Sequence, residues 1–368
     1  MKIIISGGGT GGHIFPAISV ANALKEKISD IEILFVGAEG KMEMEKVPAA
    51  GYKIIGLPVR GFQRKMSAQN VSFFFKLYKS LSMARKIIRD FSPDVVAGFG
   101  GFASGPVLRI ASKKRIPAII QEQNSYAGVT NRILSGKVDK ICVAYDEMDK
   151  FFPAEKIILT GNPVRQDLLE GKEKKTEAYK YFGLQGNRKT LLVVGGSLGA
   201  RTINESVFEG LEEMLENKIQ LIWQTGKEYY AKAQEMVSQL HTDDIRVHAF
   251  ITRMDLAYAI SDVVIARAGA ITLSELSLLC KPSILVPSPN VAEDHQTKNA
   301  MTLIKNDAAM MVEDKEAPGQ LMKNAIQLIK DEFRLNIYKE NIAKMGVRNS
   351  ASIIADVIIE LVNSNKGE

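Results

Sequence analysis

The sequence KIIISGGGTGGH, residues 2–13, joins a short apolar run to a loop rich in glycine. The three isoleucines predict a short buried strand, and the glycines predict a tight turn into a helix. The loop contains the pattern G-x-G-x-x-G at Gly7, Gly9 and Gly12. Glycines let the backbone approach a phosphate, and a helix N-terminus supplies N–H donors. A tight strand-to-helix turn without a ligand remains the alternative.

The same arrangement recurs at residues 190–199, TLLVVGGSLG. Between and after these two loops, short β-branched runs alternate with longer amphipathic segments, which is typical of parallel α/β sheets. Strands are expected at 2–6, 32–36, 53–57, 94–97, 118–121 and 140–143, and again at 190–194, 220–224, 246–250, 262–266, 283–286 and 308–312. A chain of 368 residues suits about two domains. We therefore expect an α/β protein with two Rossmann-like domains facing a cleft.

Composition and charge indicate where in the cell the protein works. The net charge is +6, and the segment from Arg60 to Asp90 alone has eight basic residues and one acid, a net +7. The two cysteines, Cys142 and Cys280, lie in apolar stretches, which predicts buried thiols in a reducing compartment. No apolar run is long enough for a signal peptide or a membrane span. The sequence indicates a cytoplasmic protein, or one attached to a membrane from the cytoplasmic side.

Three other ligand or reaction classes fit parts of the sequence less well. NAD binding at the first loop requires an acid at the end of the second strand, but Gly37 and Ala38 stand there and Glu39 comes late. A hydrolase with Ser197 in G-x-S-x-G leaves the first loop without a role. The basic segment has no nucleic-acid recognition motif, so nucleic acid is not an expected partner. No residues have metal-ligand spacing.

The third glycine cluster, Gly98 to Gly105, follows another expected strand. Three such loops at strand ends exceed what folding requires. They suggest that two phosphorylated ligands meet in one cleft.

Residues 71–88, VSFFFKLYKSLSMARKII, predict an amphipathic helix inside the basic segment. On a helix, one face carries Phe74, Leu77, Tyr78, Leu81 and Ile88, which we expect to face the core. Phe73 and Phe75 point elsewhere, and Lys76 and Lys79 flank them. Aromatic residues surrounded by cations suit an anionic membrane surface. A solvated basic helix, with its aromatic residues covered by loops, is the alternative.

Seven motifs in one order carry a resemblance to a known family: SGGGTGGHIFPA, PDVVAGFGGFASGP, QEQNSYAGVTNR, GNPVR, GGSLGAR, RAGAITLSEL and EDHQTKNA. Together they resemble the MurG family of peptidoglycan glycosyltransferases nearly from end to end. The resemblance implies the GT-B fold and inverting transfer of GlcNAc from UDP-GlcNAc. The acceptor would be the 4-hydroxyl of undecaprenyl-diphospho-MurNAc-pentapeptide, at the cytoplasmic face of the cell membrane, with no cofactor.

The resemblance also implies two domains and a donor site. Residues 1–162 would form the acceptor and membrane domain, joined by a C-terminal helix at 346–368, and residues 163–345 would bind UDP-GlcNAc. An apolar stripe at Ile353, Ile354, Val357, Ile358 and Leu361 is consistent with that returning helix. The donor residues implied by the family motifs are Arg165 and Ser197 at the diphosphate, Ile251 at the uracil, Ala270, Ile271 and Thr272 near the diphosphate and sugar, Glu275 at the ribose, and Gln296 at the GlcNAc hydroxyls.

The first domain supplies the remaining expected site residues. The resemblance places Thr10, Gly11, Gly12 and Asn124 near the donor sugar. His13 ends the first glycine loop at a helix start, and imidazole titrates near neutral pH, so His13 is the expected general base. Glu122 is the reserve candidate for that role. Ser283 and Ser288-Pro289-Asn290 depart from the family pattern before EDHQ. An NAD-dependent oxidoreductase and a non-catalytic nucleotide-sugar binding module remain the alternative functions.

Overall fold

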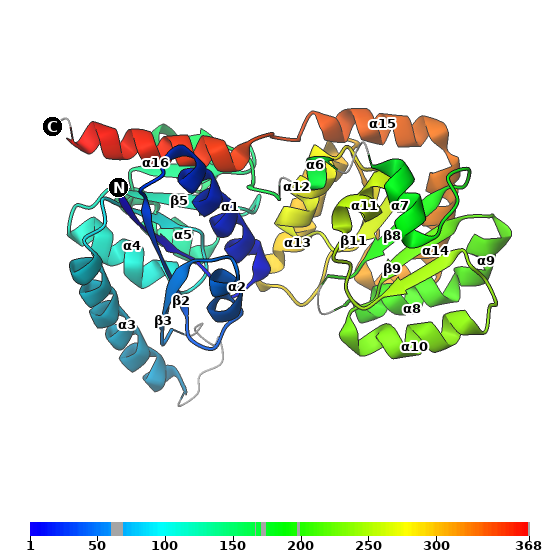
Figure 1. Cartoon of the computed structure of the whole chain (residues 1–368), viewed down its shortest axis with the longest axis horizontal. Helices are drawn as coiled ribbons and strands as arrows, with labels where there is room; N and C mark the ends of the chain where they lie inside the picture. The colour runs from blue at the N-terminus through cyan, green and yellow to red at the C-terminus, as the bar shows by residue number, and fades with distance from the viewer. Residues whose placement is uncertain (60–68, 166, 171–173, 197–198, 367–368) are drawn as a thin grey trace. The chain divides into compact units, whose positions relative to one another are not determined.

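The computed structural model describes residues 1–59, 69–165, 167–170, 174–196 and 199–366. The chain divides into two compact units (Figure 1). Unit 1 comprises Met1–Val164 and Val347–Glu368, and unit 2 comprises Arg165–Gly346. Each unit is built around its own parallel sheet, as the alternation of strand and helix patterns predicts.

Unit 1 contains a sheet of seven parallel strands in the order β3-β2-β1-β4-β5-β6-β7. Its strands are β1 (Lys2–Ser6), β2 (Glu32–Ala38), β3 (Lys53–Leu57), β4 (Val95–Gly98), β5 (Ala118–Glu122), β6 (Lys140–Val143) and β7 (Ile157–Leu159). The order reverses at β1, where β2 and β4 lie on either side. The loops after β1 and β4 therefore leave the same edge of the sheet side by side, at the point where ligands bind in doubly wound folds.

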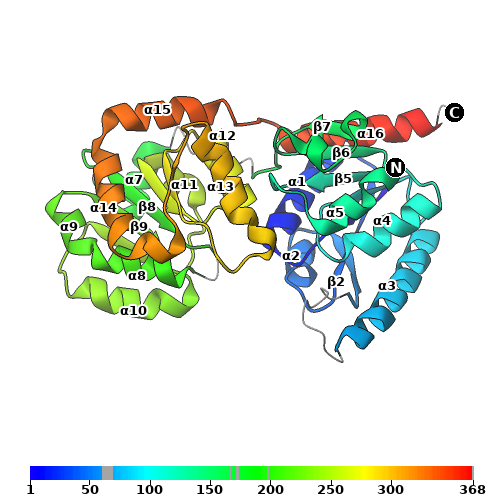
Figure 2. The same cartoon turned by 180° about the vertical axis from the view of Figure 1, so that it is seen from behind.

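Helices cover both faces of this sheet because its strands alternate their side chains between two apolar cores. Ile4 packs with α3 (Gln69–Phe91), α4 (Ser104–Lys113) and α5 (Val129–Leu134), which Figure 2 shows side by side. Ile3 and Ile5 pack with α1 (Gly11–Lys27), α2 (Glu43–Ala49) and α16 (Ser350–Lys366). Because successive residues of a strand point to opposite faces, both faces of the sheet are apolar. The unit therefore has three layers, with the sheet between two layers of helices.

The last helix, α16, lies along α1 although more than 300 residues separate them in the chain (Figure 1). Its buried stripe is Ala351, Ile354, Ala355, Ile358 and Val362. Of the predicted stripe, Ile353, Val357 and Leu361 are only half-buried, because they flank this face rather than form it. The helix belongs to unit 1, and the small residues Ala351 and Ala355 let it approach the unit closely.

Unit 2 repeats the architecture with six parallel strands in the order β10-β9-β8-β11-β12-β13. Its strands are β8 (Thr190–Val194), β9 (Gln220–Gln224), β10 (Ile245–His248), β11 (Val263–Ala266), β12 (Ser283–Leu285) and β13 (Met310–Met311). One face packs against α8 (Arg201–Glu209), α9 (Leu211–Glu216), α10 (Lys227–Ser238) and α14 (Ala317–Lys330). The other packs against α6 (Asp167–Glu170), α7 (Lys175–Phe182), α11 (Met254–Ile260), α12 (Ala270–Leu278) and α13 (His295–Lys305), while α15 (Glu332–Ala343) contributes to both cores.

The twelve expected strands all occur, and most differences are at their ends. The strand expected at 308–312 pairs only over Met310–Met311, at the edge of the sheet. One strand, β7, was not predicted. Its three residues are too few to give a periodic signal, and none of them is fully buried because β7 is also an edge strand.

The basic helix α3 corrects one expectation. Tyr78, predicted to face the core, is 75% exposed, whereas Ala84, Ile87 and Ile88 are buried. The buried face is displaced around the helix from the predicted one because α3 packs through its C-terminal half against α4. None of the described helices is both long and apolar enough to span a membrane.

Candidate active site

The first glycine loop folds around a buried carboxylate. Glu43, the first residue of α2, is fully buried and accepts hydrogen bonds from the backbone N–H of Gly9, at 3.0 and 3.2 Å, and of Ala38, at 2.9 Å. A Cβ on Gly8 would lie 2.0 Å from the Glu43 carboxylate, so a side chain at position 8 would displace that carboxylate. The Gly9 N–H therefore binds an internal anion instead of a ligand phosphate. This disfavours the phosphate site that the G-x-G-x-x-G pattern predicts at this point.

His13 is held by the same loop. Its Nδ1 donates to the carbonyl oxygen of Gly8 at 2.9 Å, and the hydroxyl of Thr10 lies 3.2 Å from that nitrogen. A neutral imidazole that donates from Nδ1 carries its lone pair on Nε2. Gly11 and Gly12 open α1 directly before His13, and all three residues are half-buried. The fold thus brings Thr10, Gly11, Gly12 and His13 together at the end of β1.

The third glycine cluster packs against this loop. Gly100 and Gly101 both have a positive φ, of 87° and 78°. A Cβ on Gly100 would lie 3.0 Å from His13 Nε2, and one on Gly101 would lie 2.3 Å from the Gly8 carbonyl oxygen. These two glycines are needed for the backbone conformation and for close approach of the two loops. They account for part of the cluster without a second phosphate.

Glu122 and Asn124 form a separate group at the end of β5. The Glu122 carboxylate is 1% exposed and accepts from the backbone N–H and side-chain amide of Asn124, both at 3.1 Å. It also accepts from Gly128 N–H at 2.9 Å and from the Asn131 amide at 2.8 Å. Four donors around one buried carboxylate fix the loop that follows β5. This geometry indicates that Glu122 positions Asn124. It is less suited to taking up a proton from a substrate.

A buried amide network beneath Glu122 did not emerge from the sequence. Gln121 donates to Asn162 at 3.0 Å, and Asn162 donates to the Gln123 carbonyl at 2.9 Å. Gln123 donates to the Phe99 carbonyl at 2.9 Å. The network links β5, the glycine cluster after β4 and the GNPVR segment. The amide residues of QEQN and GNPVR were visible in the sequence, but nothing in it indicated that they contact one another.

In unit 2, the second glycine loop is connected to the residue expected at the uracil. Gln224, at the end of β9, donates to the Gly196 carbonyl at 3.2 Å and accepts from Ile251 N–H at 2.9 Å. Gly199 has a φ of 82°, and a Cβ there would lie 2.3 Å from the Thr225 carbonyl. Ser197 lies outside the described residues. Ile251 is 4% exposed and forms part of the apolar core.

Glu275 lies on α12 and is oriented by a buried tyrosine. The phenol of Tyr258, on α11, donates to the Glu275 carboxylate at 3.1 Å. Burial, and then the negative charge of Glu275, raise the pKa of Tyr258 well above its ordinary value, whereas the positive charge of Arg165 opposes this. Tyr258 therefore remains a neutral donor at physiological pH. The charge of the exposed Arg165 acts on the same buried tyrosine that holds Glu275.

Two other predicted groups lie at the carboxyl edge of the second sheet. Ala270, Ile271 and Thr272 form the first turn of α12, whose N-cap Gly269 makes no side-chain capping bond. The backbone N–H groups of such a turn attract anions. Gln296, in α13, accepts from Ser288 N–H at 2.8 Å, which leaves its amide nitrogen as a donor. The Ser288 segment that departs from the family pattern is thus tied to Gln296.

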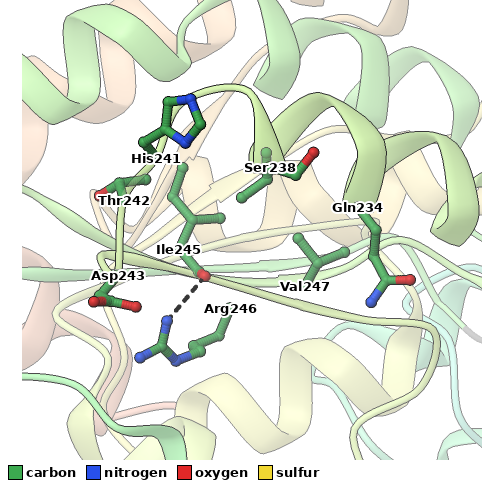
Figure 3. A pocket seen from close by; sticks show the side chains of 9 residues that line it. Gln234, Ser238, His241, Thr242, Asp243, Ile245, Arg246 and Val247 are labelled. Carbon is green, nitrogen blue, oxygen red and sulfur yellow. Dashed lines mark hydrogen bonds between the residues drawn. The ribbon is translucent and has the colours of Figure 1, made fainter.

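The pocket between the end of α10 and β10 lies elsewhere in unit 2 (Figure 3). His241, Thr242 and Asp243 come from the connecting loop, and Arg246 donates to the Ile245 carbonyl. None of the predicted site residues lines this pocket. It is therefore not part of the candidate active site.

Two Rossmann-like units, each with a glycine loop at the carboxyl end of its first strand, define a two-domain protein of the GT-B class. Comparison with known families agrees with this class. Residues 3–143 match the glycosyltransferase family 28 N-terminal domain, and residues 190–355 match the glycosyltransferase family 28 C-terminal domain.

Curated relatives match over almost the whole chain. A protein of Parabacteroides distasonis is 56% identical over 98% of both chains, and one of Phocaeicola vulgatus is 54% identical over 100% of this chain and 98% of its own. Both are named UDP-N-acetylglucosamine--N-acetylmuramyl-(pentapeptide) pyrophosphoryl-undecaprenol N-acetylglucosamine transferase. The crystal structure of Acinetobacter baumannii MurG is similar with a TM-score of 0.78 at 27% identity, over 98% of this chain and 99% of that one. This chain belongs to the MurG family within glycosyltransferase family 28.

Proposed function

We propose that this protein transfers GlcNAc from UDP-GlcNAc to the 4-hydroxyl of the MurNAc in undecaprenyl-diphospho-MurNAc-pentapeptide, with inversion at C1, in peptidoglycan synthesis. The observation that carries the proposal is the match to relatives of that name at 56% and 54% identity over nearly the full length of each chain. A match over nearly the full length covers the predicted site residues of both units, and not only one glycine loop.

We propose that unit 2 binds UDP-GlcNAc. A carboxylate at Glu275, held by Tyr258, can accept hydrogen bonds from two ribose hydroxyls. The first turn of α12 and Arg165 supply N–H donors and a positive charge for the diphosphate. Because diphosphate is the leaving group, these groups stabilise the charge that develops as the C1–O bond breaks. Ser197, Ile251 and Gln296 complete the proposed donor set.

In unit 1 we assign the general base to His13. The acceptor 4-hydroxyl oxygen forms a bond to C1, the bond from C1 to the diphosphate breaks, and the hydroxyl proton passes to Nε2 of His13. The hydrogen bond from Nδ1 to Gly8 supports this role because it leaves the lone pair on Nε2. Glu122 is the weaker candidate, since four protein donors already surround its carboxylate.

We also propose that α3 docks the protein on an anionic membrane, at the cytoplasmic face where its lipid-linked acceptor would lie. Phe75 and Tyr78 are 73% and 75% exposed, and Lys79, Arg85 and Lys86 are exposed on the same helix. We call the exposed residues Phe75, Tyr78, Lys79, Arg85, Lys86 and Arg89 the α3 patch. Lys76 is half-buried, and the side chain of Phe73 lies outside the described residues. Exposed aromatic rings beside cations suit insertion into the interface of an anionic leaflet.

A reconstituted transfer assay tests the proposed reaction. UDP release from UDP-GlcNAc should require the lipid-linked acceptor, and the product should contain a β-1,4-linked GlcNAc. A parallel binding measurement should detect UDP-GlcNAc and no NADH. Binding of UDP-GlcNAc without transfer to the acceptor would instead favour a non-catalytic binding module, and NADH binding would favour an oxidoreductase.

A further inference from the structure

Glu43 is a buried acidic residue beside the first glycine loop. Its side chain is fully buried, and it is in none of the ion pairs found among the described residues. Burying a carboxylate without a cation is costly unless hydrogen bonds replace its lost hydration. Among the residues that the structure describes, the replacement comes from the backbone N–H groups of Gly9 and Ala38. An apolar residue would fill the same place at lower cost if packing were its only purpose.

The peptide group between Gly8 and Gly9 connects this acid to His13. Its N–H, on Gly9, donates to both carboxylate oxygens of Glu43. Its carbonyl oxygen, on Gly8, accepts the hydrogen bond from Nδ1 of His13 at 2.9 Å. One planar amide therefore has a carboxylate at one end and an imidazole at the other. Because the amide is conjugated, a negative charge at its N–H end increases the negative charge on its carbonyl oxygen.

We propose that Glu43 is a positioning residue that acts on His13 through this peptide group. The carboxylate fixes the plane of the Gly8–Gly9 amide and strengthens its carbonyl as an acceptor. The carbonyl in turn keeps the Nδ1–H tautomer, in which the lone pair of the ring is on Nε2. When Nε2 takes up the acceptor proton, the same chain of dipoles stabilises the imidazolium that forms. The inference rests on the proposed role of His13 as the base.

The geometry of the loop fits this arrangement more closely than a simple brace between β2 and α2. The bond from Ala38 already connects α2 to the end of β2, and the bonds from Gly9 add a connection to the glycine loop. A Cβ at Gly8 would collide with the carboxylate, and a Cβ at Gly101 would collide with the Gly8 carbonyl. Both ends of the amide are therefore kept clear by glycine. Side chains at either position would separate Glu43 from His13.

Nitrogen NMR of the histidine rings tests the structural half of the proposal without an activity assay. The chain contains four histidines, so a sample labelled with ¹⁵N-histidine is simple, and His13→Ala identifies the His13 signals. In the wild type, His13 should be protonated at Nδ1 and unprotonated at Nε2. In Glu43→Gln the proton should redistribute toward Nε2, because the carbonyl acceptor weakens. A wild-type His13 with its proton on Nε2 would overturn the proposal.

Transfer kinetics test the functional half through a double-mutant cycle. Glu43→Gln should lower kcat by about tenfold to a hundredfold while the KM for UDP-GlcNAc stays within about twofold. In a His13→Ala background the same change should have little further effect. Glu45→Gln, on an exposed acid of the same helix, is the matched control and should leave kcat unchanged. If Glu43→Gln does not fold, Glu43→Asp is measured instead: its shorter side chain withdraws the carboxylate from the Gly9 N–H, so kcat should fall in the wild-type background and little further in His13→Ala.

The outcomes separate this inference from the proposed function. An equal loss of kcat from Glu43→Gln in both backgrounds would show a purely structural role, and wild-type kcat in that variant would show no role. Either result overturns the inference but leaves the transfer reaction intact. Normal turnover in His13→Ala alone would instead remove the base assignment on which the inference depends.

Discussion

The phenol of Tyr258 donates a hydrogen bond to the carboxylate of Glu275 over 3.1 Å, and Tyr258 itself is 2% exposed. The two residues come from neighbouring helices, α11 and α12. The bond holds one oxygen of a half-buried carboxylate and so fixes the orientation of the group. Tyr258 thus extends the proposed ribose site to a residue that does not need to touch the nucleotide.

Replacing Tyr258 with phenylalanine should weaken UDP binding by about fivefold, or about 1 kcal/mol, which is the usual net contribution of one hydrogen bond. The ring remains to fill the core, so the fold should persist. Isothermal titration with UDP measures the effect. Tyr338→Phe, another buried tyrosine of unit 2, is the control and should bind UDP normally. Equal affinities for all three proteins would show that Tyr258 does not orient Glu275 for binding.

Glu275→Ala should weaken UDP binding by about 1–3 kcal/mol, because the ribose hydroxyls lose a charged acceptor. The change should be larger than that of Tyr258→Phe, since it removes the acceptor itself. Glu205→Ala, on α8, serves as a control for the loss of one negative charge from unit 2. If UDP affinity were the same in Glu275→Ala as in the wild type, Glu275 would not belong to the donor site.

His13→Ala should lower turnover by about 10²- to 10⁴-fold, the range for loss of a general base, while UDP affinity stays nearly constant. The residue lies in unit 1, whereas the proposed UDP contacts lie in unit 2. Comparison of kcat with the directly measured UDP Kd distinguishes the two effects. Turnover close to that of the wild type would reject His13 as the base and leave Glu122 as the candidate for that role.

Replacing Phe75 and Lys79 together by serine should reduce co-sedimentation with anionic vesicles. Binding of the wild type should require anionic lipid and should weaken as salt rises, because each cation near the surface contributes about 1 kcal/mol that ions screen. Serine at both Lys180 and Tyr181, an exposed lysine and aromatic residue of unit 2, is the matched control. Equal binding of the wild type to neutral and anionic vesicles, or to neither, would contradict docking through the α3 patch.

His248 should make the stability of unit 2 depend on pH. Burial, and then the charge of Arg246, lower the pKa of His248 below its ordinary value of 6.5. Below that pH the unfolded chain takes up a proton that the folded chain resists, so stability should fall as pH decreases toward the lowered pKa. Trp223, the single tryptophan, is fully buried in β9 and reports unfolding of this unit.

Urea unfolding followed by Trp223 fluorescence at pH 7.5 and 5.5 provides the measurement. The wild type should lose more stability between these pH values than His248→Gln, which has no titrating ring. The comparison between the two proteins cancels the contribution of every other titrating group. The same pH dependence in both would show that His248 titrates alike in the folded and unfolded chains.

The sequence determined the architecture because the signals that specify it are local. An apolar run followed by glycines, as at residues 2–13, specifies a strand and a tight turn through the conformational freedom of those residues alone. Repetition of that pattern at residue 190 predicted the second unit. The sequence did not predict β7, because an edge strand of three residues gives no periodic signal. It also placed Tyr78 on the core face of its helix, although α3 packs through another face and leaves Tyr78 exposed.

The local sequence and the family motifs also selected the candidate residues, but only tertiary structure decided which of them act together. Glu43 is separated from Gly9 by 34 residues, and no spacing rule connects the two. The parallel pairing of β1 with β2 brings the end of β2, and hence α2, beside the first glycine loop. The loop that the sequence marked as a phosphate cradle is thereby supplied with an internal carboxylate. A backbone N–H binds whichever acceptor the fold places within hydrogen-bond distance, and that choice depends on contacts distant in the chain.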